Sequence, residues 1–283
     1  LGGNVSTNAG GMRAVKYGVT RDYVRGMEVV LPNGDVTEFG GKLSKNSSGY
    51  GLLHLLVGSE GTLGIITKIV LRLIPLPKKR VSLLVPFASL LFPHSDAPAY
   101  LLLLFDGNSA SELEAAYQAA AEACLAEGAL DALIADTSDR HAAVWDARGT
   151  FLEALKAVSE LELADAVVPP HLIPDFVTFC DSLGRKYGVK VLTFGHAGDG
   201  NCHIHILREK IDDDAWQAVY PQVMNEIYRK GHELGGQVSG EHGIGAAKRP
   251  YLHRWVGDIN LQLMREIKDC FDPKGILNPG KVI

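Results

Sequence analysis

Three of the ten histidines of the chain fall within one short, glycine-rich segment, GHAGDGNCHIH, at residues 195–205. His203 and His205 alternate with apolar residues, so a strand would project both side chains to the same face. His196 ends the preceding apolar run, and a hairpin across the Gly-Asp-Gly turn would bring it close to His203. Two neutral imidazoles that converge from paired strands are typical nitrogen ligands of zinc, manganese or iron.

A carboxylate would complete such a metal site, and the segment GEHGIG at residues 240–245 offers Glu241 beside His242. The flanking glycines allow the backbone to approach a ligand closely. Asp199 competes for the same role, but an Asp between two glycines more often accepts hydrogen bonds from its own turn. The other six histidines have no comparable neighbours in the sequence, and we expect surface or packing roles for them.

Two further glycine-rich segments have the composition of phosphate-binding loops. GGNVSTNAGG at residues 2–11 would let successive backbone N–H groups face an anion, and GSEGTLGIIT at residues 58–67 is a turn that enters a strand. Neither segment fits the dinucleotide-binding GxGxxG pattern or the P-loop pattern. Taken alone, each is more typical of a tight turn that binds nothing than of a ligand contact.

The composition is that of an ordinary globular protein, and it excludes several classes of function. The 283 residues are 46% apolar and 22% charged, which suffices for one large domain or two smaller ones. A net charge of −5 gives no electrostatic basis for binding nucleic acid. No apolar run approaches the roughly 18 residues needed to cross a bilayer. The four cysteines form no Cys-x-x-Cys pair, which argues against disulfides and iron–sulfur clusters and favours a reducing compartment.

The elements that must position these residues change in character along the chain. Residues 2–18 are predicted to be irregular because of their glycines, and Asn33-Gly34 is typical of a hairpin turn. Strands are expected in the first third at 27–32, 35–39, 62–75 and 81–86. Later strands are expected at 100–105, 166–168, 189–194 and 203–207, and helices at 111–126, 139–157, 174–187, 212–234 and 259–270. Strands that alternate with helices in this way predict an α/β sandwich, with helices packed on a sheet.

Taken together, these segments resemble the FAD-dependent glycolate oxidase, D-lactate dehydrogenase and D-2-hydroxyglutarate dehydrogenase group of the vanillyl-alcohol-oxidase-type flavoproteins. The matching stretches run through the whole chain in family order: GGNVSTNAGG (2–11), YGVTRDYV (17–24), VLPNG (30–34), GSEGTLGIIT (58–67), GHAGDGNCHIH (195–205), GEHGIG (240–245) and DPKGILNPGK (272–281). A chance match to all seven is implausible.

The resemblance implies an α+β fold. A partial FAD-binding, PCMH-type subdomain at residues 1–80 would precede an antiparallel-sheet substrate domain covered by helices at 81–283. Residues expected to contact the pyrophosphate of FAD are Gly2, Gly3, Asn4, Thr7, Asn8, Gly10 and Gly11; those expected near the adenosine are Gly61, Thr62, Gly64, Ile65 and Ile66, with Asn278 near the flavin. The family's first FAD subdomain has no counterpart, so the chain is interpreted as a fragment. Near 88–93 the family has a further helix and strand, so we expect either that residues are missing there or that the protein is a natural deletion.

The resemblance also implies the ligands of a metal ion and a catalytic base. His196, His203 and Glu241 would bind a divalent zinc, manganese or iron ion, and His242 would take a proton from the substrate. Such an ion acidifies a bound hydroxyl group, which makes the proton transfer to a neutral imidazole feasible.

The implied substrate is a D-2-hydroxy acid. Arg148 would hold its carboxylate, and His205 stands where the hydroxyglutarate enzymes carry an Asn beside the substrate. Leu163 falls where those enzymes carry a Lys for the distal carboxylate, which favours D-lactate or glycolate over a dicarboxylate. A hydride would pass to FAD, and the electrons would then pass to an iron–sulfur subunit, an electron-transfer flavoprotein or a quinone.

Three alternatives accompany this interpretation. A metallohydrolase would use the same His and Glu ligands with an activated water, but it would not need two FAD-type glycine loops. A flavoprotein of non-redox chemistry, such as alkyl-glycerone-phosphate synthesis, fits the hydroxy-acid motifs poorly. A flavin-free truncated domain would act as a subunit or binding module. The expected location is the cytoplasm, or the membrane periphery through a partner.

Overall fold

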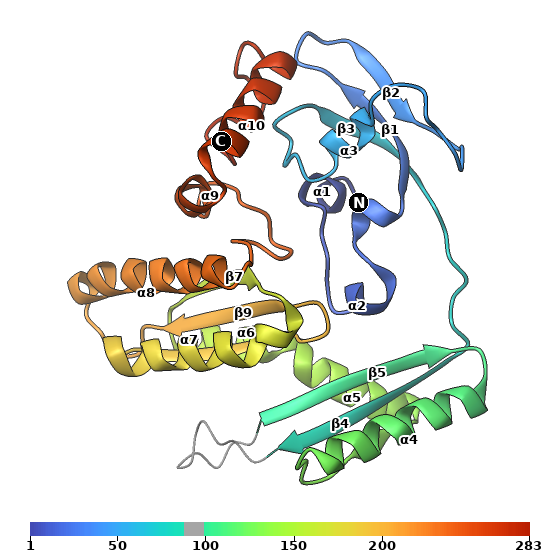
Figure 1. The fold of residues 1–283 in the computed structure, drawn as a ribbon, viewed down its shortest axis with the longest axis vertical. Helices are drawn as coiled ribbons and strands as arrows, with labels where there is room; N and C mark the ends of the chain where they lie inside the picture. The colour runs from blue at the N-terminus through green and yellow to red at the C-terminus, as the bar shows by residue number, and fades with distance from the viewer. Residues whose placement is uncertain (88–98) are drawn as a thin grey trace. The chain divides into compact units, whose positions relative to one another are not determined.

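The computed structural model describes residues 1–87 and 99–283, which form two compact units (Figure 1). One unit combines Leu1–Leu73 with Ser159–Ile283, and the other comprises Ile74–Val158. The missing residues expected near 88–93 lie outside the described part of the chain. None of the described helices combines the length and the apolar character that a membrane span requires. The division into domains at 1–80 and 81–283 remains a prediction.

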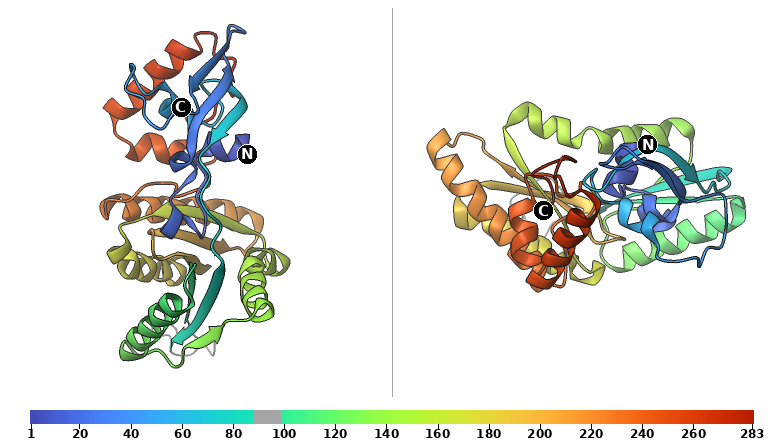
Figure 2. Two further views of the ribbon diagram at one scale, coloured as in Figure 1. Left: turned by 90° about the vertical axis from the view of Figure 1, so that its right-hand side faces the viewer. Right: turned by 90° about the horizontal axis from the view of Figure 1, so that it is seen from above.

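The N-terminal sheet has the order β2-β1-β3, and both pairings are antiparallel. Its strands are β1 (Val24–Val30), β2 (Val36–Gly40) and β3 (Ile65–Leu71). The hairpin predicted across Asn33-Gly34 is confirmed, since Val30 pairs with Val36. Helix α10 (Asp258–Phe271) packs Ile267 and Phe271 against the core of this sheet, so a C-terminal helix covers the N-terminal sheet (Figures 1 and 2).

The prediction that residues 2–18 are irregular is wrong, because they form helices α1 (Gly2–Thr7) and α2 (Ala14–Tyr17). Val5 of α1 is 1% exposed in the core of the N-terminal sheet, and this packing outweighs the low helix propensity of glycine. Asn8 ends α1 in the left-handed conformation, with φ at 51°. The short helix α3 (Leu52–Leu56) was not predicted either.

The unit at Ile74–Val158 contains a second antiparallel sheet, with the order β5-β4-β6. Its strands are β4 (Lys79–Phe87), β5 (Ala99–Gly107) and β6 (Leu133–Ala135), and helix α4 (Ala110–Ala126) begins at the N-cap Ser109. The single helix predicted at 139–157 is instead two, α5 (Ser138–Gly149) and α6 (Phe151–Val158). The break falls at Thr150, whose hydroxyl donates to the carbonyl oxygen of Ala147 at 2.9 Å and so competes with the helical bonds.

The third sheet carries the histidines and has the order β7-β9-β8, again antiparallel. Its strands are β7 (Leu161–Val167), β8 (Lys190–His196) and β9 (Asn201–Leu207). Strand β7 begins earlier than predicted because it pairs with β9 along its whole length. Antiparallel pairing in all three described sheets confirms the α+β class implied by the resemblance, in place of an α/β sandwich.

Helices α7 (Ile173–Tyr187) and α8 (Asp213–Glu233) cover one face of this third sheet. Cys202, Ile204 and Ile206 of β9 point into that core, where they meet the side chains of Phe176, Cys180, Leu183, Trp216, Val223 and Ile227. The alternate positions of β9, which include His203 and His205, therefore lie on the opposite face. Helix α9 (Arg249–Trp255) and two 3₁₀ turns, Thr20–Asp22 and Pro170–Leu172, complete the described elements.

The β8–β9 turn requires glycine at Gly200, whose φ is 86°. A Cβ atom at Gly200 would lie 1.9 Å from the carbonyl oxygen of Val168, which is a severe clash with backbone. We expect Gly200→Ala to lower the free energy of unfolding by at least about 2 kcal/mol, through strain and displacement of the turn. Urea unfolding followed by circular dichroism measures this change.

Gly231→Ala in α8 is the matched control, because its Cβ would make only ordinary contact with the Phe176 ring at 3.8 Å. Alanine favours a helix interior by about 0.5 to 1 kcal/mol over glycine, so we expect no loss of stability. Equal unfolding free energies for the two variants would contradict the constraint at the turn.

Candidate metal and active site

The β8–β9 hairpin brings His196 and His203 together, as their spacing predicts. Phe194 pairs with His203 and His196 with Asn201 in the register of the two strands. The rings of His196 and His203 lie edge to face, with centroids 5.3 Å apart. Both residues are less than one tenth exposed. Asp199 serves its own turn, as expected, because its Oδ1 accepts a hydrogen bond from the Asn201 N–H at 3.2 Å.

Glu241 supplies a carboxylate to the two imidazoles. Its Oε1 lies 3.2 Å from His203 Nε2, and its Oε2 lies 4.0 Å from His196 Nδ1. The close approach of His203 Nε2 and the nearby imidazoles hold the pKa of Glu241 below its usual range, although burial opposes this shift. The carboxylate is therefore ionised at neutral pH, as a metal ligand must be.

The donor set of His196, His203 and Glu241 fits a divalent transition metal. One ligand atom from each of the three residues lies within 4.8 Å of the others. Ligands bonded to zinc at its usual distances stand about 3.0 to 3.5 Å apart, so a small closure of the present geometry suffices. Two imidazole nitrogens and a carboxylate oxygen suit zinc, manganese or iron.

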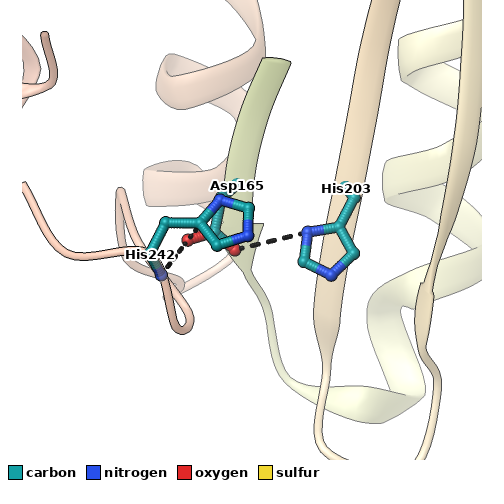
Figure 3. A group of neighbouring side chains, drawn as sticks. All are labelled: Asp165, His203 and His242. Atoms are coloured by element: carbon teal, nitrogen blue, oxygen red, sulfur yellow. Dashed lines mark hydrogen bonds and ion pairs between the residues drawn. The ribbon is translucent and has the colours of Figure 1, made fainter. Parts of the chain in front are cut away.

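A buried carboxylate that no motif of the sequence contains, Asp165 on β7, lies between His203 and His242 (Figure 3). It is fully buried and stands opposite His203 in the register of β7 and β9. Its oxygens accept hydrogen bonds, at 2.7 to 3.2 Å, from the side chains of Asn201, Ser239 and Lys248 and from the backbone N–H groups of Gly240, Glu241 and His242.

Burial alone raises the pKa of Asp165, but the charge of Lys248 and the donated hydrogen bonds outweigh it and hold the pKa well below its usual range. The carboxylate is thus ionised at neutral pH while fully removed from water. An Asp flanked by apolar residues within a strand was the only signal in the sequence, since such residues are rarely buried without a partner.

His242 lies over the ligand set and is the most accessible of its histidines. Its ring stacks on that of His203 with centroids 5.1 Å apart, and its side chain is 40% exposed. Burial, together with the charge of Lys248, lowers the pKa of His242, and Asp165 opposes the shift. The ring is therefore neutral at neutral pH and able to accept a proton.

Of the two other predicted catalytic residues, His205 follows His203 on the same face of β9, and Arg148 belongs to the other unit. His205 is 1% exposed and stacks on Phe194 with ring centroids 4.1 Å apart. Arg148 lies on α5, in the unit at Ile74–Val158, near the ring of Phe151. Their roles beside a substrate remain predictions.

Glu60, which sequence reasoning also missed, joins three of the predicted motifs. It adopts a left-handed φ of 51°, and its two carboxylate oxygens accept the N–H groups of Ile244 and Gly245 at 2.6 and 2.7 Å. The side chain of Asn278 donates to the carbonyl oxygen of Glu60 at 2.6 Å. Gly10 of the first glycine-rich segment lies beside the proposed ligand Glu241, because a Cβ at Gly10 would meet Glu241 Cβ at 3.5 Å.

The FAD-type segments thus lie within the same unit as the metal ligands. Part of their glycine content has a packing reason, since a Cβ at Gly64 would lie 2.4 Å from a methyl group of Val29. Contacts of the residues predicted at the pyrophosphate, adenosine and flavin remain predictions.

Comparison with known proteins gives matches along the whole chain. Residues 68–282 match the family described as "FAD linked oxidases, C-terminal domain", and residues 1–40 match the "FAD binding domain" family. The chain is 42% identical to a D-lactate dehydrogenase of Anaerostipes hadrus and 36% identical to glycolate oxidase subunit GlcD of Bacillus subtilis. These alignments cover all of this chain and 68% and 67% of the two relatives.

The alignment with the D-lactate dehydrogenase spans 325 positions, whereas the chain has 283 residues, so 42 positions have no counterpart here. Among solved structures, an alkyldihydroxyacetonephosphate synthase is similar in fold, with a TM-score of 0.63 and 16% identity. That similarity covers 99% of this chain and 57% of the synthase chain. At this level of identity the comparison concerns the fold alone.

The pairing of Asp165 with Lys248 is testable through stability. Asp165→Asn leaves a buried lysine without its counter-charge, and we expect it to cost about 3 to 5 kcal/mol of unfolding free energy. Lys248→Met likewise leaves the buried Asp165 carboxylate without its counter-charge, and we expect a similar loss of unfolding free energy. The double variant removes both charges, so we expect it to lose less than the sum of the two single losses. Urea unfolding of all four proteins gives the coupling energy.

Additive losses, within about 0.5 kcal/mol, would show that the two charges do not depend on each other. Lys186→Met with Glu226→Gln is the matched control, because that ion pair at 3.1 Å lies on the surface, with the lysine side chain 56% exposed. We expect a coupling below about 1 kcal/mol there.

Proposed function

The chain belongs to the FAD-linked oxidases, and on that premise we propose that it oxidises a D-2-hydroxy acid by hydride transfer to FAD, with a divalent metal ion binding the substrate. The observation that carries the proposal is the convergence of His196, His203 and Glu241 beneath the accessible ring of His242. The metallohydrolase alternative uses the same ligands, but the family membership favours redox chemistry.

The residues of the chain divide the work of the proposed reaction. When bound by His196, His203 and Glu241, the ion supplies acidification of the substrate hydroxyl, and FAD supplies the hydride acceptor. His242 takes the hydroxyl proton, because its neutral ring lies beside the ligand set and is open to solvent. Arg148 orients the substrate through its carboxylate, which a guanidinium group binds with two parallel hydrogen bonds.

A compact monocarboxylate such as D-lactate or glycolate is the substrate that we favour. Leu163 lies two residues from Asp165 on β7, so both side chains project to the face of the sheet that carries His203. An apolar side chain there offers no charge to a second carboxylate. The similarity to a D-lactate dehydrogenase and a glycolate oxidase subunit supports this choice. An iron–sulfur subunit, an electron-transfer flavoprotein or a quinone would accept the electrons.

Metal content tests the ligand assignment directly. We expect about one zinc, manganese or iron ion per chain after reconstitution and dialysis, and we expect His203→Ala to lose it, because one of three ligands is removed. His171→Ala is the control, since that histidine is exposed on the Pro170–Leu172 turn and should leave the content unchanged. Elemental analysis gives the ratio. A wild-type protein that stays metal-free with all three ions contradicts the proposal.

A variant of His242 distinguishes the role of a base from that of a metal ligand. We expect His242→Ala to keep the metal ion and to lower the turnover of D-lactate by about 10²- to 10⁴-fold, because no group is left to take the proton. Stopped-flow loss of oxidised-flavin absorbance in the FAD-loaded protein measures the step, with glycolate and D-2-hydroxyglutarate run in parallel. Turnover at the wild-type rate would exclude His242 as the base.

A further inference from the structure

Two groups of potential metal ligands share His203. One is the set of His196, His203 and Glu241, and the other consists of Asp165, His203 and His242 (Figure 3). Each of the two nitrogens of the His203 ring faces the carboxylate of a different group. Nε2 faces Glu241 Oε1 at 3.2 Å, whereas Nδ1 faces Asp165 Oδ1 at 3.7 Å. Only one of these groups can receive the lone pair of a neutral imidazole, which resides on a single nitrogen.

The second group is unsuited to a metal ion because one oxygen of Asp165, Oδ2, is already saturated with donors. Its Oδ2 accepts three consecutive backbone N–H groups, the hydroxyl of Ser239 and the ammonium group of Lys248. A cation on this oxygen would have to displace the ammonium group of Lys248, which is only 8% exposed and would lose its buried counter-charge. Glu241 accepts no comparable set of hydrogen bonds among the described residues, so its carboxylate remains available to bind a metal ion.

We propose that Asp165 is a positioning residue that selects the tautomer of His203: its carboxylate accepts the Nδ1 proton, so that Nε2 presents its lone pair to the metal ion. This inference rests on the proposed metal site. His203 Nδ1 is buried and has no other hydrogen-bond partner among the described residues. A shift of about 0.7 Å would bring the pair to hydrogen-bond distance. Histidine ligands commonly donate their second N–H to a carboxylate, which fixes the ring and raises its basicity.

The same carboxylate also sets the place of the third ligand. The N–H groups of Gly240, Glu241 and His242 converge on Asp165 Oδ2, so the backbone that carries Glu241 cannot move without breaking these bonds. Gly240 must lack a side chain here, since a Cβ would lie 2.1 Å from the Asn201 amide that Asp165 also binds. Asp165 therefore positions a nitrogen ligand from β9 and an oxygen ligand from the 239–242 loop at once.

Zinc affinity of suitable variants tests this role. Asp165→Asn is made in the Lys248→Met background, so that no buried charge is left unpaired, and it is compared with Lys248→Met alone and with the wild type. The probe is Zn²⁺ in competition with a chromophoric chelator, without FAD or substrate. We expect the double variant to bind zinc about 10- to 100-fold more weakly than Lys248→Met. Asp199→Asn is the control, because that carboxylate is 4.0 Å from His196 and its side chain is 28% exposed; we expect unchanged affinity.

A second measurement needs no variant at Asp165. In the zinc-loaded wild type, ¹⁵N side-chain NMR of histidine should show His203 protonated at Nδ1 and zinc-bound through Nε2. A general loosening of the loop would weaken zinc binding but would not exchange the two nitrogens. The reverse tautomer, with His203 bound through Nδ1, overturns the inference even if the Asp165 variants do not fold.

The outcomes separate this inference from the proposed function. If the wild type binds no zinc, manganese or iron, both fail. If the wild type binds zinc, but Asp165→Asn in the Lys248→Met background binds it equally well, the positioning role is refuted and the metal site stands. Weaker binding together with Nε2 ligation in the wild type supports the role of Asp165.

Discussion

The candidate site depends on one carboxylate that has been removed from water. Burying an ion costs several kcal/mol unless its partners replace the lost hydration, and Asp165 meets this requirement with Lys248 and a full set of hydrogen-bond donors. Three of those donors are consecutive backbone N–H groups, which can converge on one oxygen only if the 240–242 backbone curls around it. The conformation that displays Glu241 and His242 is thus a consequence of solvating a buried charge.

A second carboxylate holds the other end of the same loop. Glu60 accepts hydrogen bonds from the backbone N–H groups of Ile244 and Gly245. The N–H groups before Gly243 therefore bind one carboxylate, Asp165, and those after it bind another, Glu60. Asp165 reaches the loop from the third sheet, and Glu60 reaches it from the glycine-rich turn ahead of β3. A side chain at Gly243 would meet the Glu60 carboxylate at 2.9 Å, which explains a glycine there. The loop therefore ties the FAD-type segments to the sheet that bears the histidines.

The parts of this arrangement that local patterns encode were predictable, and the rest were not. Alternation around His203 and the Gly-Asp-Gly turn predicted the hairpin correctly, because strand periodicity and turn chemistry act over a few residues. Asp165 belongs to no motif, and its partner Lys248 lies 83 residues away; the partners of Glu60 lie 184 and 185 residues away. The prediction for residues 2–7 was wrong for the same reason: burial of Val5 against a sheet that is distant in the sequence overrides the low helix preference of glycine.

Burial sorts the clustered histidines into the roles that the proposed reaction needs. His196 and His203 are nearly inaccessible, and their ring nitrogens face the carboxylate of Glu241, the arrangement that a metal ion held by these three residues would need. His242 is the one whose ring is substantially open to solvent, so a proton that it accepts can leave without passing through the ligands. Its stacking on His203 holds the ring beside the proposed ligand set, where the proposed reaction requires a base. A single buried carboxylate beneath both rings makes this separation possible, because it orders the ligand and the base without occupying either role.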